Sequence, residues 1–139
     1  MNWFQARDEN YTTPIVKGMR RKKPTARSRT LSDDELRCVW HGSDEVGPTF
    51  GGLIKVLLLT AQRRQKVATM RWTDVKDGTW TTAADHWGKR TAGTLRLPKM
   101  VLDLIERQPR IVGNPYVFAG RDKGPFNSFS EGKRTLEHR

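Results

Sequence analysis

The sequence predicts a mixed α+β fold, mainly helical, with one small antiparallel β-sheet at its edge. Three features support this prediction: a capped amphipathic segment soon after residue 30, an apolar segment ending at residue 60, and two short β-like segments around a polar loop. The 139 residues amount to about one domain, long enough to bury a single modest core.

Two helices are expected in the first half of this domain. Segment 32–40 begins with a capping box, in which Ser32 stands three residues before Glu35, and the HGSDEVGP that follows is expected to end the helix. The inner face of this helix is expected to hold Leu36, Val39 and Trp40. Pro48 suits the first turn of the next helix, 49–60, which is apolar nearly all round and should form the buried centre.

Shorter elements are expected in the second half. A short helix is predicted around 67–70, and segments 78–84 (GTWTTAA) and 93–98 (GTLRLP) have strand composition, with a loop between them that suits a hairpin tip. The inner face of a further helix, opened by Pro98, is expected to hold Met100, Val101, Leu104 and Ile105. A buried extended piece at 117–118 and a polar helix over 128–139 complete the expected elements.

The positive charge is concentrated near the start of the chain. The formal net charge of +11 and the pI near 10.4 favour a polyanion as partner, most simply nucleic acid. Segment 17–29 contains no acid, and its basic residues are Lys17, Arg20, Arg21, Lys22, Lys23, Arg27 and Arg29. With its prolines and glycine this segment has linker composition, so we expect 1–29 to precede the folded domain and 30–139 to form it. A solvated tether is an equally good interpretation of the basic run.

Several classes of site are excluded by composition. Cys38 is the only cysteine, so neither an intramolecular disulfide nor a metal site of paired cysteines is expected. No apolar stretch approaches the length that spans a membrane, and the first residues lack the apolar core of a signal peptide. We therefore expect a cytoplasmic protein with no membrane partner.

Five short motifs, in this order, resemble the catalytic domain of tyrosine recombinases, the phage integrase family. They are LLLTAQRR, VATMRWTDV, GTWTTAA, GKRTAGTLRLP and NPYVFAGRDKGPFNSFS, and they look most similar to proteobacterial prophage and genomic-island integrases. The resemblance covers about residues 30–139. It implies the N-terminal part of an integrase catalytic domain, with 1–29 as the end of a preceding DNA-binding domain and a basic interdomain linker.

The resemblance assigns a role to Arg63, which stands three residues after Thr60. It takes the place of the family's first catalytic arginine, which binds the scissile phosphate and stabilises the charge that develops on its oxygens. A guanidinium offers a planar fork of donors that matches two phosphate oxygens. Arg64 is expected to face solvent or a neighbouring DNA phosphate. Where the family usually has an acid, this chain has Lys66, so either another carboxylate orients Arg63 or the loss is tolerated.

The loop between the β-like segments supplies the second catalytic candidate. In the family a hairpin lysine acts as the general acid that protonates the leaving 5′-oxygen. Lys89 matches by residue type, whereas Arg90 fits the spacing to Pro98 slightly better; the alternative for both is a hairpin tip that displays charge to water. The residues expected to contact DNA are Lys17, Arg20, Arg21, Lys22, Lys23, Arg64 and Arg90.

The family's nucleophile has no counterpart in these residues. The family supplies a His-x-x-Arg box and a later tyrosine, whereas Tyr11 and Tyr116, the two tyrosines present, follow no such box. Without a phosphotyrosine intermediate, we expect this chain alone to bind DNA and not to cut it, as a truncated remnant or a fragment of a longer integrase.

Double-stranded DNA is the expected partner, together with self-association or the tetramer that the resemblance implies. Neither a metal, a cofactor nor a small-molecule substrate is expected, because transesterification through tyrosine needs none. A bacterial, nucleoid-associated location follows from the same resemblance. The alternative is a non-catalytic basic nucleic-acid-binding module, in which Trp3, Phe4 and Trp87 would stack on single-stranded bases. A third interpretation is a regulatory fragment that competes with a full-length integrase.

Overall fold

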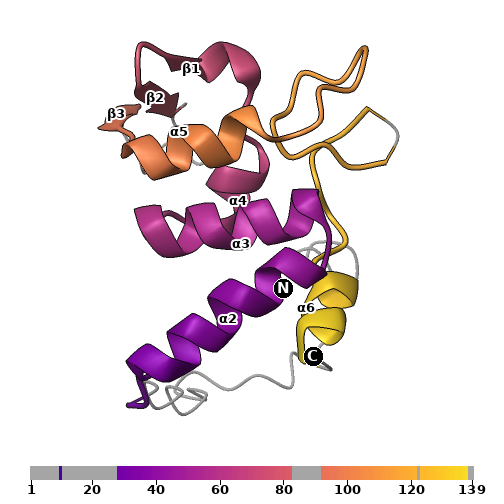
Figure 1. The fold of residues 1–139 in the computed structure, drawn as a ribbon. Helices are drawn as coiled ribbons and strands as arrows, with labels where there is room; N and C mark the ends of the chain where they lie inside the picture. The colour runs from indigo at the N-terminus through magenta and orange to yellow at the C-terminus, as the bar shows by residue number, and fades with distance from the viewer. Residues whose placement is uncertain (1–9, 11–27, 83–91, 122, 138–139) are drawn as a thin grey trace. The chain divides into compact units, whose positions relative to one another are not determined.

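A computed structural model describes residue 10 and residues 28–82, 92–121 and 123–137 of the chain. The chain divides into two units, Met1–Thr30 and Leu31–Arg139, and the second is the one with described helices and strands. Figure 1 shows helix α3 (Pro48–Thr60) in the middle of this unit, between α2 (Asp33–Glu45) on one side and α5 (Lys99–Glu106) with the small sheet on the other. The architecture is the expected α+β fold.

Helix α2 begins as predicted and ends later than predicted. The Ser32 hydroxyl accepts a hydrogen bond from the Glu35 amide at 3.3 Å, and the Glu35 carboxylate accepts one from the Ser32 amide at 2.9 Å. The prediction that the helix breaks after residue 40 was wrong. Ser43 is accommodated because its hydroxyl donates to the Val39 carbonyl at 2.6 Å. Ser43 is also the buried residue of this helix, whereas Leu36, expected on the inner face, is exposed.

Helix α3 begins with Pro48 at its first turn, as expected, and packs closely against α2. A Cβ built on Gly51 would lie 1.8 Å from the Ser43 carbonyl oxygen, so the two helix backbones approach one another at a position that only glycine permits. The prediction of burial nearly all round was wrong for the last turn, since Leu58 and Leu59 are 39% and 37% exposed. The buried face of α3 is formed by Phe50, Leu53 and Val56.

A left-handed residue joins α3 to α4 (Arg64–Ala68). Ala61 has φ 49° and ψ 24°, and its amide donates to the Leu57 carbonyl at 2.9 Å, which ends α3. A Cβ makes this conformation costly, so Ala61 occupies a place that glycine would fill with less strain. After the turn, α4 buries Val67 and Ala68 against the core.

The sheet has three antiparallel strands in the order β1 (Val75–Lys76), β2 (Thr79–Thr82) and β3 (Gly93–Arg96). Strand β1 was not expected. It pairs with β2 through the two-residue turn Asp77–Gly78, in which both residues have positive φ, 48° and 71°. An Asp-Gly pair is a strong signal for this turn type. The loop that joins β2 to β3, predicted as a hairpin tip, falls on residues 83–91, outside the described residues.

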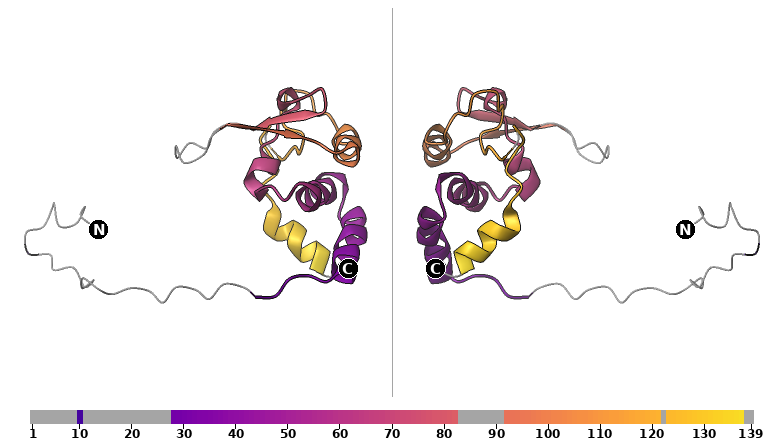
Figure 2. Two further views of the ribbon diagram at one scale, coloured as in Figure 1. Left: turned by 90° about the vertical axis from the view of Figure 1, so that its left-hand side faces the viewer. Right: turned by 90° about the vertical axis from the view of Figure 1, so that its right-hand side faces the viewer.

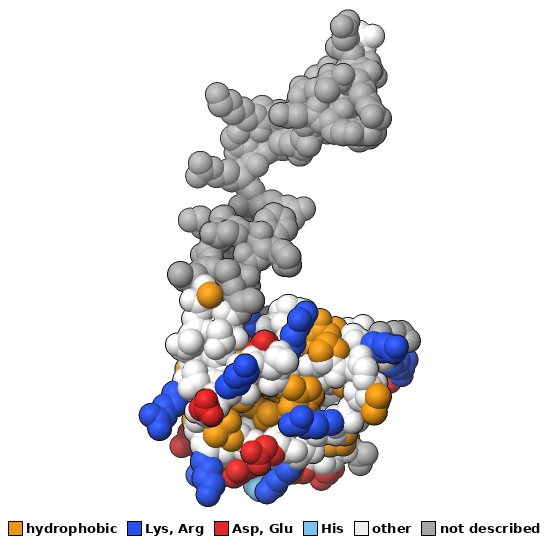
Figure 3. Space-filling view, turned by 90° about the horizontal axis from the view of Figure 1, so that it is seen from above, with side chains coloured by type: hydrophobic (Ala, Val, Ile, Leu, Met, Phe, Trp, Pro, Cys, Tyr) orange, Lys and Arg blue, Asp and Glu red, His pale blue; other side chains and the backbone are white. Residues whose placement is uncertain are grey.

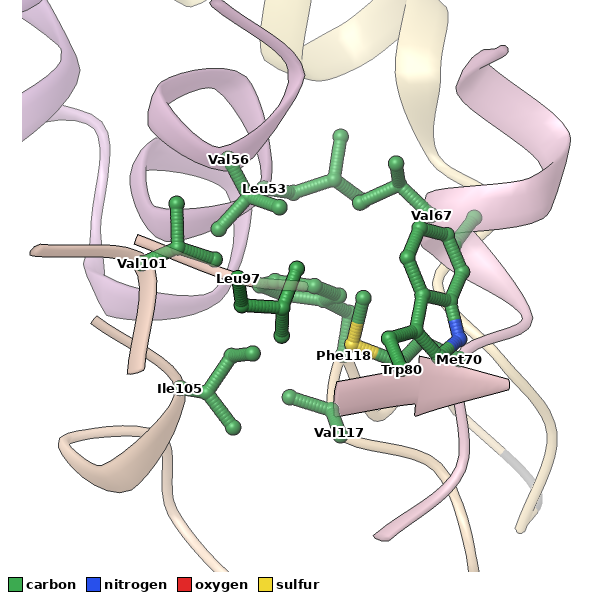
Figure 4. Packing of buried hydrophobic residues seen from close by; sticks show 11 residues of the cluster. Leu53, Val56, Val67, Met70, Trp80, Leu97, Val101, Ile105, Val117 and Phe118 are labelled. Atoms are coloured by element: carbon green, nitrogen blue, oxygen red, sulfur yellow. The ribbon is translucent and has the colours of Figure 1, made fainter. Parts of the chain in front are cut away.

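The core gathers side chains from α3, α4, α5, the sheet and the segment around residue 117. Figure 4 shows Trp80 of β2 beside Met70, with Leu53 and Val56 of α3 above them. Val117 and Phe118 are fully buried, as predicted, and the Val117 amide donates to the Met70 carbonyl at 2.9 Å. On α5, Val101 and Ile105 are buried but Met100 is 53% exposed, so its assignment to the inner face was wrong.

Helix α6 (Phe129–Glu137) lies against α2 and α3 (Figures 1 and 2). Glycines again permit the contacts: a Cβ on Gly132 would lie 2.7 Å from the Phe50 ring, and one on Gly42 would lie 3.0 Å from a Leu136 methyl. Between α2 and α3, the Lys55 side chain is only 7% exposed and forms an ion pair with Asp44. Its ammonium also lies 4.8 Å from the centre of the Trp40 ring.

The α2–α3 contact predicts that Gly51→Ala destabilises the protein by about 1–3 kcal/mol, because the methyl group would force the helix backbones apart. Gly93→Ala is the matched control, since a Cβ there meets only the Thr82 hydroxyl at 3.5 Å, an ordinary contact. Urea unfolding of both variants measures the difference. Equal free energies of unfolding for the two variants would contradict the close helix contact.

The left-handed conformation of Ala61 predicts that a substitution to glycine at this position stabilises the protein. Ala61→Gly is expected to raise the free energy of unfolding by about 0.5–1 kcal/mol, because relief of left-handed strain outweighs the greater chain entropy of glycine. The same substitution within α4, Ala68→Gly, should lower it by about 1 kcal/mol. A loss of stability in Ala61→Gly would show that Ala61 is not strained.

Candidate phosphate-binding site

Arg63 stands at the junction of α3 and α4, where it is the N-cap residue of α4 in extended conformation, φ −66° and ψ 138°. Two features hold its backbone: the Ala61 turn before it and the hydrogen bond from the Val67 amide to its carbonyl, 3.2 Å long. The side chain is exposed. The fold therefore presents this guanidinium at the surface from a backbone that is anchored to the core on both sides.

Arg63 has no carboxylate partner among the residues that the structure describes. Lys66, which stands where an acid was anticipated, is half-buried in the last turn of α4. The sequence left open whether another carboxylate orients Arg63 or whether the loss of the acid is tolerated. Within residues 28–82, 92–121 and 123–137, no other carboxylate orients Arg63. The donors of Arg63 remain available to water or to an anion.

Arg64 is held by an aromatic ring. Its guanidinium carbon lies 4.4 Å from the centre of the Phe129 ring, in the first turn of α6. Figure 2 shows the start of α6 next to α4. Arg64 is nevertheless exposed, and it forms no ion pair with a described residue. A side chain facing solvent or a DNA phosphate was expected, and the exposed position agrees with this, but the ring had no signal in the sequence.

Two further arginines lie over aromatic rings, which the sequence did not indicate. The Arg110 guanidinium lies 4.2 Å from the Trp72 ring centre, and the Arg71 guanidinium lies 5.5 Å from that of Tyr116. Arg71 and Tyr116 face one another in an isolated antiparallel bridge. Because each partner is distant in sequence from the other, no local pattern could have revealed these pairs. Trp72 within the motif VATMRWTDV was visible, but its partner was not.

The remaining sequence-predicted contacts cannot be placed beside Arg63. Lys89 and Arg90 lie outside the described residues, and so does the basic group Lys17, Arg20, Arg21, Lys22 and Lys23. The strand ends that flank the 83–91 loop are described: the Thr82 hydroxyl donates to the Gly93 carbonyl at 3.0 Å. The structure thus places the Arg64 guanidinium beside the Phe129 ring, in the residue that follows Arg63 in the chain.

Apolar side chains are exposed on another part of the unit. Viewed from above, the molecule shows hydrophobic side chains gathered among Lys and Arg side chains (Figure 3). Among the large apolar side chains of the described residues, those of Met100, Ile111 and Val112 have the highest exposed fractions. Within the described residues, no group of three His, Cys, Asp or Glu side chains has metal-binding geometry. None of the described helices is both long and apolar enough to cross a membrane.

The comparison with known proteins gives a fold and no close sequence relative. No family model matches the chain, and no curated protein matches it. Among solved structures, a lambda integrase dimer bound to a COC′ core site superposes with a TM-score of 0.65 at 17% identity, over 86% of this chain and 36% of that chain. A lambda integrase tetramer bound to a Holliday junction gives a TM-score of 0.63 at 18% identity, over 97% of this chain and 43% of that one.

A third structure, a lambda integrase(75-356) dimer bound to a COC′ core site, gives a TM-score of 0.62 at 19% identity, over 86% of this chain and 46% of that one. This chain therefore spans less than half the length of the integrase chains that it matches. The resemblance to tyrosine recombinases that the five motifs indicated is confirmed at the level of the fold. Over most of its length, the chain has the α+β fold of lambda integrase.

Proposed function

We propose that this chain is part of a site-specific DNA recombinase of the tyrosine type, and that Arg63 binds a phosphate of the DNA backbone. The observation that carries the proposal is an exposed arginine without a described carboxylate partner, on a backbone fixed between the central helix and α4. Its in-plane donors match two oxygens of one phosphate. Since the backbone is already fixed, little reorganisation is needed when charge develops on those oxygens.

The proposed reaction is strand cleavage and rejoining through a phosphotyrosine. A tyrosine oxygen would form a bond to phosphorus while the bond from phosphorus to the 5′-oxygen breaks. We propose that Lys89 gives its proton to that oxygen, with Arg90 as the neighbouring alternative. The position of these residues on the loop between β2 and β3 supports their inclusion. Residues 17–29 would add sequence-independent contacts to phosphates.

Tyr116 is poorly suited to act as the nucleophile. It is half-buried in the bridge with Arg71, under that guanidinium, and its amide donates to the Asn114 side chain at 3.0 Å. We propose that the attacking tyrosine belongs to a part of the active enzyme other than these described residues. The neighbours are integrase dimers and a tetramer on DNA, which supports assembly of the active protein on DNA. We also propose that its sites belong to a mobile element such as a prophage.

Substitution of Arg63 tests the phosphate contact. Arg63→Ala is expected to weaken binding to a duplex DNA by about tenfold, because a charged hydrogen-bonding partner of phosphate is lost. The slope of log affinity against log salt should also fall by about 0.9. Arg37→Ala is the matched control: it removes the same charge from an exposed arginine that is already paired with Asp34 at 2.6 Å. Fluorescence anisotropy over a salt series measures both quantities.

An equal loss in the two variants would mean that net charge alone drives binding. The same titrations with single-stranded DNA address the alternative of a basic binding module. Tighter binding to single strands, unaffected by Arg63→Ala, would favour that module over a recombinase surface.

Because Tyr116 is not expected to be the nucleophile, the chain should form no covalent adduct with DNA. The 139-residue chain should bind nicked duplex DNA without forming a covalent adduct, since Tyr116 is engaged in the bridge with Arg71. Tyr116→Phe should leave the affinity for DNA unchanged. Denaturing gels of the mixture, beside an integrase of known activity, show the adduct directly. An adduct that disappears in Tyr116→Phe would make Tyr116 the nucleophile.

A further inference from the structure

A row of aromatic rings ends on Arg64. The rings of Phe50 and Phe126 are 5.4 Å apart between centres, and those of Phe126 and Phe129 are 5.3 Å apart with an edge-to-face angle of 84°. The Arg64 guanidinium lies 4.4 Å from the last ring. The three rings come from α3, from the segment before α6, and from α6, so the arginine rests on a support built by three parts of the chain.

A stacked guanidinium keeps its hydrogen-bonding capacity. When the face of the planar group packs on a ring, its five N–H donors lie in the plane and stay available to an anion. An ion pair with a carboxylate would occupy those donors, but no described carboxylate pairs with Arg64. The ring therefore restricts the side chain without neutralising it. Such a group has already lost the conformational freedom that binding an anion would otherwise remove.

We propose that Phe129 is a positioning residue for DNA binding, and that it holds Arg64 as a second phosphate-binding guanidinium next to Arg63. This inference rests on the proposed function, since it needs DNA as the ligand. It gives α6 a role at the phosphate-binding surface, although α6 itself supplies no charge to this contact. The two arginines are then positioned in different ways. The turn at Ala61 fixes the backbone of Arg63, whereas the ring of Phe129, distant in sequence, holds the side chain of Arg64.

The competing role for Phe129 is packing alone. Its ring also lies against the hydrophobic core, so its loss would loosen α6 whether or not Arg64 binds DNA. A double-mutant cycle separates the two roles, because a positioning residue acts only through the group that it positions. Structural damage would lower affinity to the same extent with or without Arg64.

The experiment measures duplex DNA affinity and its salt slope for the full chain and for Phe129→Leu, Arg64→Ala and the double variant. Arg64→Ala should weaken binding about tenfold and reduce the slope by about 0.9. Phe129→Leu should weaken binding about two- to fivefold without that change in slope, because the charge remains. In the Arg64→Ala background, Phe129→Leu should have no further effect. An undiminished effect there would overturn the proposal.

Two conservative variants keep the test decisive if Phe129→Leu folds poorly. Phe129→Tyr retains the ring and should bind DNA like the wild type, whereas Arg64→Lys retains the charge, loses the planar fork and should bind more weakly. Arg64→Lys with wild-type affinity would also overturn the proposal. Failure of the proposed function would look different from failure of this inference. If the chain has no phosphate-binding surface, Arg63→Ala and Arg37→Ala would also change the DNA affinity equally.

Discussion

The burial of α3 is the constraint on which the rest of the folded unit depends. Its Leu53 and Val56 side chains fill the core beneath the sheet, and its Gly51 lies against the α2 backbone. Its first turn meets α6, where Gly132 leaves space for the Phe50 ring. A helix enclosed on these sides leaves its sequence little freedom, which explains both its apolar composition and its small residues. Its last turn reaches the surface, with Leu58 and Leu59 exposed, and Arg63 follows there.

Within the described residues, more exposed arginines lie over an aromatic ring than form an ion pair with a carboxylate. The guanidinium groups of Arg64, Arg71 and Arg110 each lie over an aromatic ring, and none forms an ion pair with a described residue. Stacking orients a cation but leaves its charge in place, whereas an ion pair cancels it. A surface built in this manner keeps a positive field, and that field attracts polyanions from solution.

Local signals in the sequence located most of the elements. The capping box at Ser32, the proline at position 48 and the apolar run after it each act over a few residues, so they could be recognised without the fold. The end of α2 was misjudged because Gly42 and Ser43 lie in contact with α6 and α3, and because the Ser43 hydroxyl bonds to the Val39 carbonyl within the helix. Strand β1 carried a usable signal, the Asp77–Gly78 pair, that was overlooked. Arg63 was identified from its motif, whereas the support of Arg64 depends on Phe129 and could not be seen before the chain was folded.

The buried pair Val117 and Phe118 has a consequence for the order of folding. These residues complete a core whose other members, such as Leu53, Met70 and Trp80, come from much earlier in the chain. The Met70–Val117 hydrogen bond joins the same distant segments. Contacts of such sequence separation form slowly, because the chain between them must first be closed into a loop. During synthesis on the ribosome, the earlier helices would therefore wait with their apolar faces open until residue 118 has left the exit tunnel. That interval is the period in which a chaperone would have most to bind.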